Sequence, residues 1–419
     1  MVESILVVGA TGFTGTLVAE YLGKYPNPTF HLQLGARSPS KLAHLIAEKD
    51  LAGVTSIVVD VTKEDDVEKA VLGADVIINC AGPFGKYGTP VLAACARHGR
   101  HYVDITGEVW WIQEMIERFD YLAYKNGAAI IPASAFDSIP ADILAYFSVK
   151  TLKSIMGPET TVGKSITAHK LKSTMSGGTA ATVVSAFDGE VSPSRLEEAL
   201  KPYALSPIKG KSAGQLRLLY SLPHVTHPPI HGSYFIMSGV NTAVVRRTWG
   251  LLQTRDAAWT SYGDSFDYDE FMALPSIAMA LFVSTLLAFG AALLKWFSPV
   301  RSYFLSKMPL GSGPSPETLA NGWYKGVNVT SSLSDPPRHV QTTLKIKGDP
   351  GYAGAAVMVS ESAIALLPQN RDTLTPLGRE GGVLTPMSAI GDTLIERLKA
   401  TGRIEIDSFE VVDGHAKKD

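Results

Sequence analysis

The sequence predicts an α/β protein in which a doubly wound parallel sheet is followed by a second, α+β domain with an antiparallel sheet. Three observations predict this fold class. The chain opens with an apolar strand-like run, a glycine-rich turn and a helical run in direct succession. Five further strand-like runs follow at the spacing of βα units. From about residue 164 the strand-like runs alternate polar and apolar residues, which is typical of antiparallel sheets with one buried face.

The glycine-rich turn is the first candidate binding site. Ser4–Val8 is an apolar run of strand length, and it leads directly into GATGFTG, residues 9–15. In a Rossmann-type unit the first glycine permits the tight turn, the second lets the backbone approach a pyrophosphate, and the third lets helix and strand pack closely. A glycine turn without a ligand is the alternative. The strand–turn–helix context favours dinucleotide binding, and the binding residues we expect are Gly9, Thr11, Gly12, Phe13 and Gly15.

The end of the second predicted strand indicates which nicotinamide cofactor is bound. An NAD-preferring site usually offers Asp or Glu there to the ribose 2′-hydroxyl, whereas this chain has Arg37, followed by Ser38 and Lys41. A guanidinium can hold a 2′-phosphate through two parallel hydrogen bonds, and a carboxylate would repel it. A solvated arginine at a strand end is common, but here the acidic residue is missing as well. The sequence therefore favours NADP.

The later strands of the first domain predict further contacts with the dinucleotide. Parallel strands place their carboxyl ends at one edge of the sheet, where ligands of such folds bind. The predicted strands are residues 56–61, 75–82, 101–107 and 128–134. We expect Asp60 to reach the adenine side. We expect the loop NCAGPF to line the nicotinamide ribose, through Asn79, Ala81, Gly82 and Pro83.

Two acidic residues just beyond later strand ends are the candidate catalytic proton donors. Hydride transfer needs a dry pocket, an oriented nicotinamide and a proton donor. Glu108 follows the fifth strand, and Asp137 follows the sixth. Each residue has a structural alternative, since Glu108 could orient a loop and Asp137 could cap the helix that follows it.

A second catalytic pattern is interpreted as structural. Tyr121 and Lys125 have the Y-x-x-x-K spacing of the pair that delivers a proton in short-chain dehydrogenases. Those enzymes also need a serine at the preceding strand end, where this chain has Thr106. We therefore expect a partly buried tyrosine and a C-terminal lysine on a helix that packs against the sheet.

Several motifs, in order along the chain, carry a family resemblance. They are GATGFTG, NCAGPF, YVDITGE, FDSIPAD, GSGPSPE, DPGYAGAAVMVSESAIAL and GGVLTPMSAIGDTLIERL. Together they resemble the saccharopine dehydrogenase-like oxidoreductases, a group that includes the trans-acting enoyl reductases of lipid and polyketide pathways. The resemblance implies an NADP-type Rossmann domain and a second α+β domain. It does not imply that saccharopine is the substrate.

Composition argues against several partners and compartments. The net charge of −2 at pH 7 produces no basic field, so we expect no nucleic-acid binding. The histidines are scattered, and Cys80 and Cys95 have no ligand partner at zinc spacing, so we expect no metal. The N-terminus has no basic region ahead of an apolar run, so we expect a protein that is not secreted.

The chain is expected to form three parts. Residues 1–145 are the NADP-binding domain, 146–370 the α+β substrate and dimerisation domain, and 371–419 a C-terminal helix and strand that pack back on the first domain. Gly177 and Gly178 precede a helical run whose N-terminus could bind a substrate carboxylate or thioester oxygen, or could simply pack. The strands expected in the second domain are residues 232–239, 243–249, 260–266, 323–332 and 340–347.

The segment 271–297 is unusual for an enzyme of polar substrates. Its ~24 uncharged residues, Phe271 to Leu294, would rise about 36 Å as a helix, enough to cross a bilayer. A full span would separate the late motifs from the cofactor domain. We therefore expect a helix or hairpin that dips into one leaflet, on the cytosolic side of the endoplasmic reticulum or on a lipid droplet. A buried helix or a homodimer interface is the alternative.

Three functions remain open from the sequence. The first is an NADPH-dependent reductase of a lipid-like or acyl (enoyl) substrate at a membrane or lipid-droplet surface. The second is a saccharopine-type amino-acid dehydrogenase, which calls for several arginines in its pocket. The third is a non-catalytic, NADP-binding scaffold on a lipid surface. The apolar segment favours the first, because an enzyme of soluble amino acids has no use for it.

Overall fold

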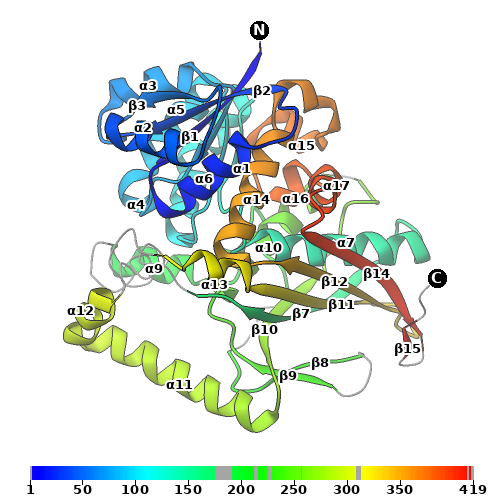
Figure 1. The fold of residues 1–419 in the computed structure, drawn as a ribbon. Coiled ribbons are helices and arrows are strands. Elements are labelled where there is room, and N and C mark those ends of the chain that lie inside the picture. The colour runs from blue at the N-terminus through cyan, green and yellow to red at the C-terminus, as the bar shows by residue number, and fades with distance from the viewer. Residues whose placement is uncertain are drawn as a thin grey trace.

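Two sheets, one above the other in Figure 1, organise the chain, and helices pack between them. The structure is a computed structural model that describes residues 2–174, 191–211, 216–224, 229–255, 257–307, 313–412 and 415–416. The predicted helix after Gly177 and Gly178 lies outside the described residues. The combination of a parallel sheet with a second α+β domain confirms the predicted fold class.

The first sheet has seven parallel strands in the order β13-β6-β5-β4-β1-β2-β3. All six predicted strands of the first domain are present. Ile5, Leu6 and Val7 of the interior strand β1 are fully buried, because helices cover both faces of the sheet. The strands are β1 (Glu3–Val8), β2 (Phe30–Ala36), β3 (Thr55–Val58), β4 (Val76–Asn79), β5 (His101–Asp104), β6 (Ala129–Ile131) and β13 (Gly382–Val383).

The direction of strand order reverses between β1 and β4, and this reversal positions the site. In doubly wound sheets the ligand binds beyond the carboxyl ends of the strands at such a switch point. The loops after β1 and β4 are GATGFTG and NCAGPF. The helices that surround the sheet are α1 (Phe13–Gly23), α2 (Pro39–Glu48), α3 (Glu64–Leu72), α4 (Phe84–Tyr87), α5 (Thr89–His98) and α6 (Val109–Lys125).

The second sheet is mixed, with strand order β15-β14-β12-β11-β7-β10-β9-β8. Its neighbours are antiparallel except for β7 and β10, which are parallel. The purely antiparallel expectation is therefore corrected: a long crossover that includes a helix separates β7 from β10, as a parallel pair requires. The strands are β7 (Val162–Lys172), β8 (Tyr220–Leu222), β9 (Ile230–Ser233), β10 (Asp267–Leu274), β11 (Trp323–Ser332), β12 (His339–Lys347), β14 (Ile404–Val412) and β15 (His415–Ala416).

Two long helices join the second sheet to the first domain. Helix α7 (Ile139–Met156) packs on β11 and β12, and α10 (Ser238–Gln253) packs on β10 and on α7. Figure 1 shows both helices between the two sheets. Shorter helices complete the fold: α9 (Pro193–Ala199), α12 (Ser298–Lys307), α13 (Pro316–Ala320), η1 (Pro350–Gly354), η2 (Pro368–Thr373), α15 (Pro376–Glu380) and α16 (Pro386–Ala389).

Two of the predicted strands in the second domain are wrong, and a third, 232–239, keeps only its first two residues, in β9. Residues 243–249 form the middle of α10, although their valines and tryptophan favour strands. Burial decides here, because Val244, Val245 and Trp249 all pack into the interior, and packing overrides a weak local propensity. Residues 260–266 form no strand and instead make a turn-rich connection into β10.

The last third of the chain belongs to both domains, which differs from the predicted boundaries. Helix α14 (Ala355–Ala365), placed by the prediction in the second domain, packs against α1, β4 and β5 of the first. Strand β13 extends the first sheet, and α17 (Asp392–Ala400) packs on α14. The terminal strand β14 instead pairs with β12 in the second sheet. Its alternating pattern suits that sheet, because every second residue can point into the core.

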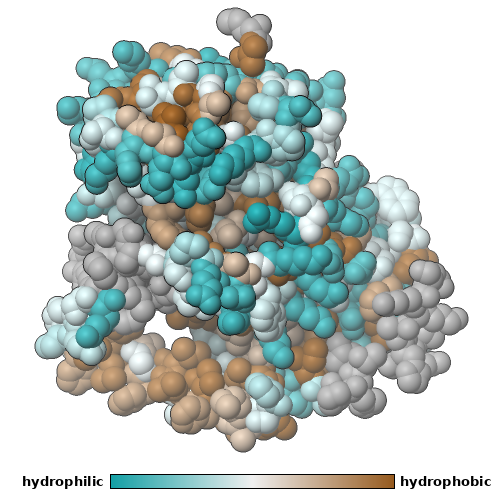
Figure 2. Space-filling model, viewed as in Figure 1, coloured by the Kyte–Doolittle hydropathy of each residue, from teal (hydrophilic) through white to brown (hydrophobic). Residues whose placement is uncertain are grey.

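Helix α11 (Ile277–Trp296) carries most of the apolar segment, whereas residues 271–274 complete β10. It lies at the edge of the molecule beside β9 (Figure 1). Figure 2 shows its side chains as a hydrophobic band along the lower edge. Ala280 and Ser284 are its buried residues. Among the described residues it is the one helix with the length and composition to cross a membrane.

Candidate functional site

The glycine turn has the geometry that a dinucleotide needs. Gly9 has φ +77°, and a Cβ there would lie 2.8 Å from the nitrogen of Ala81. A Cβ on Gly15 would lie 2.2 Å from the carbonyl oxygen of Gly9, so only glycine lets α1 approach β1 this closely. Gly12 is the N-cap of α1, where no side chain caps the helix and no acidic residue lies in the first turn. The free N–H groups at this end fit a pyrophosphate.

A segment of the second domain lies against the same turn. The ring of Phe13 meets the ring of Tyr352 edge-on, with centroids 5.2 Å apart. A Cβ on Gly313 would lie 2.3 Å from the Phe13 ring, so the chain at Gly313 passes directly over that ring. Thr11 is partly exposed beside it. Phe13 therefore helps to join the domains, and its predicted contact with the dinucleotide stays a prediction.

The turn after β2 presents the residues predicted to select NADP. Arg37 and Lys41 are exposed, and Ser38 begins α2 by accepting a hydrogen bond from the Lys41 N–H at 3.3 Å. Asp60 lies nearby: hydrogen bonds from Thr62 hold the pKa of its carboxyl below the usual range, and the charge of Arg37 adds a smaller effect. The arrangement leaves the Arg37 guanidinium available to a 2′-phosphate.

Replacing Arg37 by Ala should weaken NADPH binding about 10- to 100-fold and change NADH binding little. The loss corresponds to the charge-assisted hydrogen bonds of a guanidinium to a phosphate. Fluorescence titration with both cofactors measures it. Arg118→Ala, an exposed arginine on α6, is the matched control. Equal losses for the two cofactors would contradict the assignment of NADP selectivity to Arg37.

The loop after β4 is held by a chain of buried hydrogen bonds. Asn79 accepts from the Ala81 N–H at 3.0 Å and donates to the Tyr102 hydroxyl at 3.2 Å. That hydroxyl donates to Asp104 at 2.8 Å, and Asp104 also accepts from two backbone N–H groups. Burial raises the pKa of Asp104 to about 7, and the hydrogen bonds oppose the shift. The network fixes the predicted loop, which continues through Gly82 and Pro83, against β1.

The two candidate proton donors have different surroundings. Both carboxylate oxygens of Glu108 accept backbone N–H groups at the start of α4, from Phe84 at 2.8 Å and from Gly85 at 2.9 Å. Glu108 is also buried, at the N-cap position of α6. Its carboxylate therefore holds the loop between β4 and α4 in place, which is the structural role that the sequence left open.

Asp137 is partly buried and makes no hydrogen bond within the described part of the chain. It does not cap α7, whose N-cap is Ser138. Its carboxyl lies beside Gly107, where a Cβ would be 3.4 Å from Oδ2. Burial raises its pKa to about 6. A carboxyl with no partner among the described residues, and with a pKa raised toward neutrality, has the properties of a proton donor.

A large pocket opens next to these strand ends. It has a volume of about 680 Å³, within the range of small-molecule sites. Residues 107–110 form its wall on the first domain, and the first turns of α10 and the region of α9 form the opposite wall. Most of its lining is apolar, with a few polar groups such as Glu108, Arg246 and Asp269. Its apolar lining includes Val109, Trp110, Leu196, Leu200, Leu216, Ile236 and Val240.

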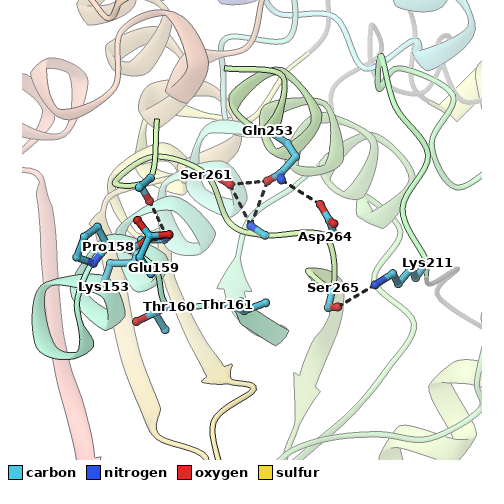
Figure 3. Close-up of a pocket in the computed structure, with 12 residues that line it drawn as sticks. Lys153, Pro158, Glu159, Thr160, Thr161, Lys211, Gln253, Ser261, Asp264 and Ser265 are labelled. Carbon is cyan, nitrogen blue, oxygen red and sulfur yellow. Dashed lines mark hydrogen bonds between the residues drawn. The ribbon is translucent and has the colours of Figure 1, made fainter. Parts of the chain in front are cut away.

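A second hollow, of about 340 Å³, lies far from the strand ends and holds no predicted site residue. Figure 3 shows it between the end of α7 and the connection into β10. Its polar groups bind one another: Gln253 accepts from Ser261 and Gly263, and Lys153 donates to the carbonyls of Pro158 and Ala258. Satisfied groups of this kind indicate a structural role.

The structure also places the Y-x-x-x-K pair and the possible metal ligands. Tyr121 is 76% exposed on the outer side of α6, and Lys125 is exposed as well, so the Y-x-x-x-K pair does not reach the pocket. The expectation of a partly buried tyrosine is wrong, because Tyr121 points into solvent. In the part of the chain that the structure describes, no group of three or more His, Cys, Asp or Glu side chains is placed to bind a metal.

The sequence did not reveal a buried polar network on the second sheet. His169 contacts the Tyr324 hydroxyl at 2.8 Å and the Glu270 carboxylate at 3.0 Å. Tyr268 and Asn241 donate to the same carboxylate, each at 2.8 Å. The Tyr324 ring packs edge-on against Phe136, the neighbour of Asp137. These residues come from separate strands and a helix, so no local motif could have indicated them.

Comparison with known proteins shows the family of the chain. The saccharopine dehydrogenase NADP binding domain matches residues 5–131. Trans-acting enoyl reductases of Mycobacterium ulcerans and Mycobacterium tuberculosis are 30% and 29% identical to the chain, and each alignment covers 95% of this chain and 96% of the relative. Saccharopine dehydrogenase (L-Glu forming) of Saccharomyces cerevisiae shares the fold over 98% of this chain and 100% of its own, with a TM-score of 0.55 at 13% identity. The chain belongs to the saccharopine dehydrogenase-like oxidoreductases, the family that includes the trans-acting enoyl reductases, and it is an NADP-dependent oxidoreductase.

Proposed function

We propose that this oxidoreductase reduces the carbon–carbon double bond of an acyl (enoyl) substrate with NADPH, at the cytosolic surface of a membrane or lipid droplet. The observation that carries the proposal is the mostly apolar pocket of about 680 Å³ beside Asp137 and the strand ends. An acyl chain would remove apolar surface from water there. The names of the mycobacterial relatives support the same chemistry.

The reaction needs one hydride and one proton. Bound NADPH supplies the hydride to the β carbon of the enoyl group. The α carbon must then receive a proton, and we assign Asp137 as its donor, because its carboxyl lies beside the pocket wall without a hydrogen-bond partner in the described part of the chain. Glu108 positions the loop after β4 through the N–H groups of Phe84 and Gly85.

Helix α11 supports the lipid-surface setting. Exposed side chains occupy a wide arc around it: at 3.6 residues per turn, Leu281, Phe282, Leu286 and Met279 span about 160°. A flat protein partner would cover only part of this arc, whereas lipid would cover all of it. The last turn of α11 holds Lys295 and Trp296, and α12 adds Arg301 and Lys307. An aromatic residue and cations at this end of the helix suit an anionic membrane surface.

The helix is expected to lie in the surface rather than to cross the membrane. The strand before it, β10, and the strand after it, β11, both belong to the second sheet. Its Ala280–Ser284 face is packed on the protein, and the Ser284 hydroxyl donates to the Leu218 carbonyl at 2.7 Å. A helix held along one face, with both ends returning to one sheet, can immerse its other face in a single leaflet.

The saccharopine-type alternative is less well supported by the arginines in the described part of the chain. Arg195 pairs with Glu117 at 2.9 Å, and Arg247 binds the carbonyls of Leu205 and Val383. Arg246 lines the pocket, and its guanidinium also binds backbone carbonyls, those of Pro202 and Tyr268. A substrate with several carboxylates would need more than one free guanidinium.

Purified protein should oxidise NADPH with a sixteen-carbon trans-2-enoyl thioester and not with saccharopine, and it should float with phospholipid vesicles. Absorbance at the NADPH band and a sucrose-gradient flotation measure the two parts. Phe282→Glu/Phe289→Glu, on the exposed face of α11, should abolish flotation. Leu72→Glu/Tyr121→Glu, at exposed positions of the first domain, is the matched control.

The outcomes separate the three functions. Activity with saccharopine would establish the amino-acid dehydrogenase instead. NADPH binding without turnover of either substrate would establish the scaffold. A wild-type protein that sediments as a dimer and does not float would assign α11 to a homodimer interface.

A further inference from the structure

We propose that the acyl chain passes directly from the lipid surface into the pocket along residues 216–220, which we name the apolar path. This inference rests on the proposed function and adds the route by which its substrate arrives. Leu216 and Tyr220, at the two ends of the path, both line the pocket. Between them, the carbonyl of Leu218 accepts the hydrogen bond from Ser284 of α11. The same five residues therefore touch the pocket and the lipid-facing helix.

The path presents apolar side chains to the outside of the molecule. Leu216 is 81% exposed, Leu218 is 60% exposed and Leu219 is 36% exposed. Consecutive exposed leucines are unfavourable in water, and clusters of this kind mark contact with an apolar partner. Here they lie next to α11, whose exposed face is apolar as well. Arg217, exposed among the leucines, is a cation at the level that lipid headgroups would occupy.

The inner end of the path is fixed in place. The ring of Tyr220 stacks on Phe271 of β10 with centroids 5.9 Å apart, and its hydroxyl accepts a hydrogen bond from the Arg217 N–H at 3.0 Å. Tyr220 is buried and held by these contacts, and its side chain lines the pocket where the path meets it. At the mouth, Ile236 lines the pocket and is itself 55% exposed. An acyl chain that follows these residues stays in contact with apolar side chains from the leaflet to the pocket and is not exposed to water.

The test measures transfer without relying on turnover. A sixteen-carbon fatty acid with a fluorescent nitrobenzoxadiazole group is loaded into phosphatidylcholine–phosphatidylserine vesicles, and its transfer to the protein is followed by stopped flow. Leu218→Gln/Leu219→Gln alters the path without touching the pocket lining. Transfer from vesicles should slow by about tenfold, because polar side chains interrupt the apolar contact. Binding of the same probe from vesicle-free solution, and flotation, should match the wild type.

Leu72→Gln/Leu333→Gln, two exposed leucines away from the path, is the matched control and should transfer the probe at the wild-type rate. Wild-type transfer rates in the path variant would overturn the path and leave the proposed function intact. Loss of flotation in the path variant would also overturn it, since the leucines would then be part of the anchor. Failure of the wild-type protein to bind the probe, with or without vesicles, would overturn the acyl pocket and the path together.

Discussion

Replacing Asp137 by Asn should lower kcat with an enoyl thioester by about a hundredfold or more, and NADPH affinity should stay at the wild-type value. Asn keeps the size of the side chain but carries no acidic proton. The Asp137 carboxyl lies beside Gly107, which lines the pocket. Steady-state NADPH oxidation and a fluorescence titration of NADPH give the two measurements. Wild-type kcat in the variant would remove Asp137 from the chemistry.

The pH dependence of kcat/KM of the wild-type enzyme should follow the ionisation of Asp137. Because burial raises the pKa of Asp137 to about 6, the protonated form is the minor one above that pH. For a proton donor, kcat/KM should therefore fall as the pH rises through about 6. The residual activity of Asp137→Asn should lack this decline. A decline that survives the substitution would point to another acid.

The substitution Asp137→Asn should raise stability at pH 7 while it lowers activity. The pKa of Asp137 rises from 3.8 in the unfolded chain to about 6 in the folded one, so the folded state binds more protons in that window. Folding is then favoured as the pH falls from 6 to 4, and the ionised carboxylate is unfavourable at pH 7. Asp137→Asn should thus have a higher Tm than the wild type at pH 7, and the difference should vanish below about pH 4. A gain in stability with a loss of activity is typical of functional residues.

Glu270→Ala should lower the free energy of unfolding by about 3–5 kcal/mol. Glu270 is fully enclosed in the second sheet and accepts hydrogen bonds from Tyr268 and Asn241 while contacting His169. Removing the carboxylate leaves these polar groups buried without their partner, and burial without a hydrogen bond is costly. Urea unfolding measures the loss. Glu270→Gln should restore part of it, because an amide oxygen still accepts.

Glu405→Ala is the matched control for Glu270. Glu405 lies on the surface of β14, where it pairs with Lys345 and Lys347 across the strands. Exposed ion pairs contribute little to stability, because water and salt screen them. The urea midpoint of this variant should remain at the wild-type value. Equal midpoints for Glu270→Ala and the wild type would show that the buried network does not stabilise the second sheet.

The first domain was predictable because its signals are local. A continuous apolar run such as Ser4–Val8 indicates a strand buried on both faces, and the glycines that follow it have positions that only glycine can occupy. Arg37 and Asp60 follow β2 and β3 closely in sequence, so their place at the ligand edge follows from the topology. Hydrophobic pattern and turn residues are sufficient to predict a structure in which residues close in sequence are also close in space.

In the second domain, local sequence patterns did not predict the secondary structure and the strand pairing correctly. Residues 243–249 have the composition of a strand, yet they are helical because α10 is enclosed by α7, β10 and the first domain. Sequence also could not place β14, since pairing with β12 depends on which sheet has a free edge. The contacts of the two candidate acids also came only from the structure: Glu108 accepts the N–H groups of Phe84 and Gly85, and the N-cap of α7 is Ser138 rather than Asp137.

By itself, the sequence determined the cofactor domain, the family and the presence of one long apolar segment. Each of these is a property of a continuous stretch or of motifs in order. Only the tertiary structure decided that Asp137 lacks a partner among the described residues, that Glu270 and His169 meet, and that residues 107–110, the region of α9, Leu216, Tyr220 and the start of α10 line one pocket. The physical reason is that a pocket or a buried pair is made by chain segments far apart in sequence. Their contact depends on how the two sheets pack, which no local pattern encodes.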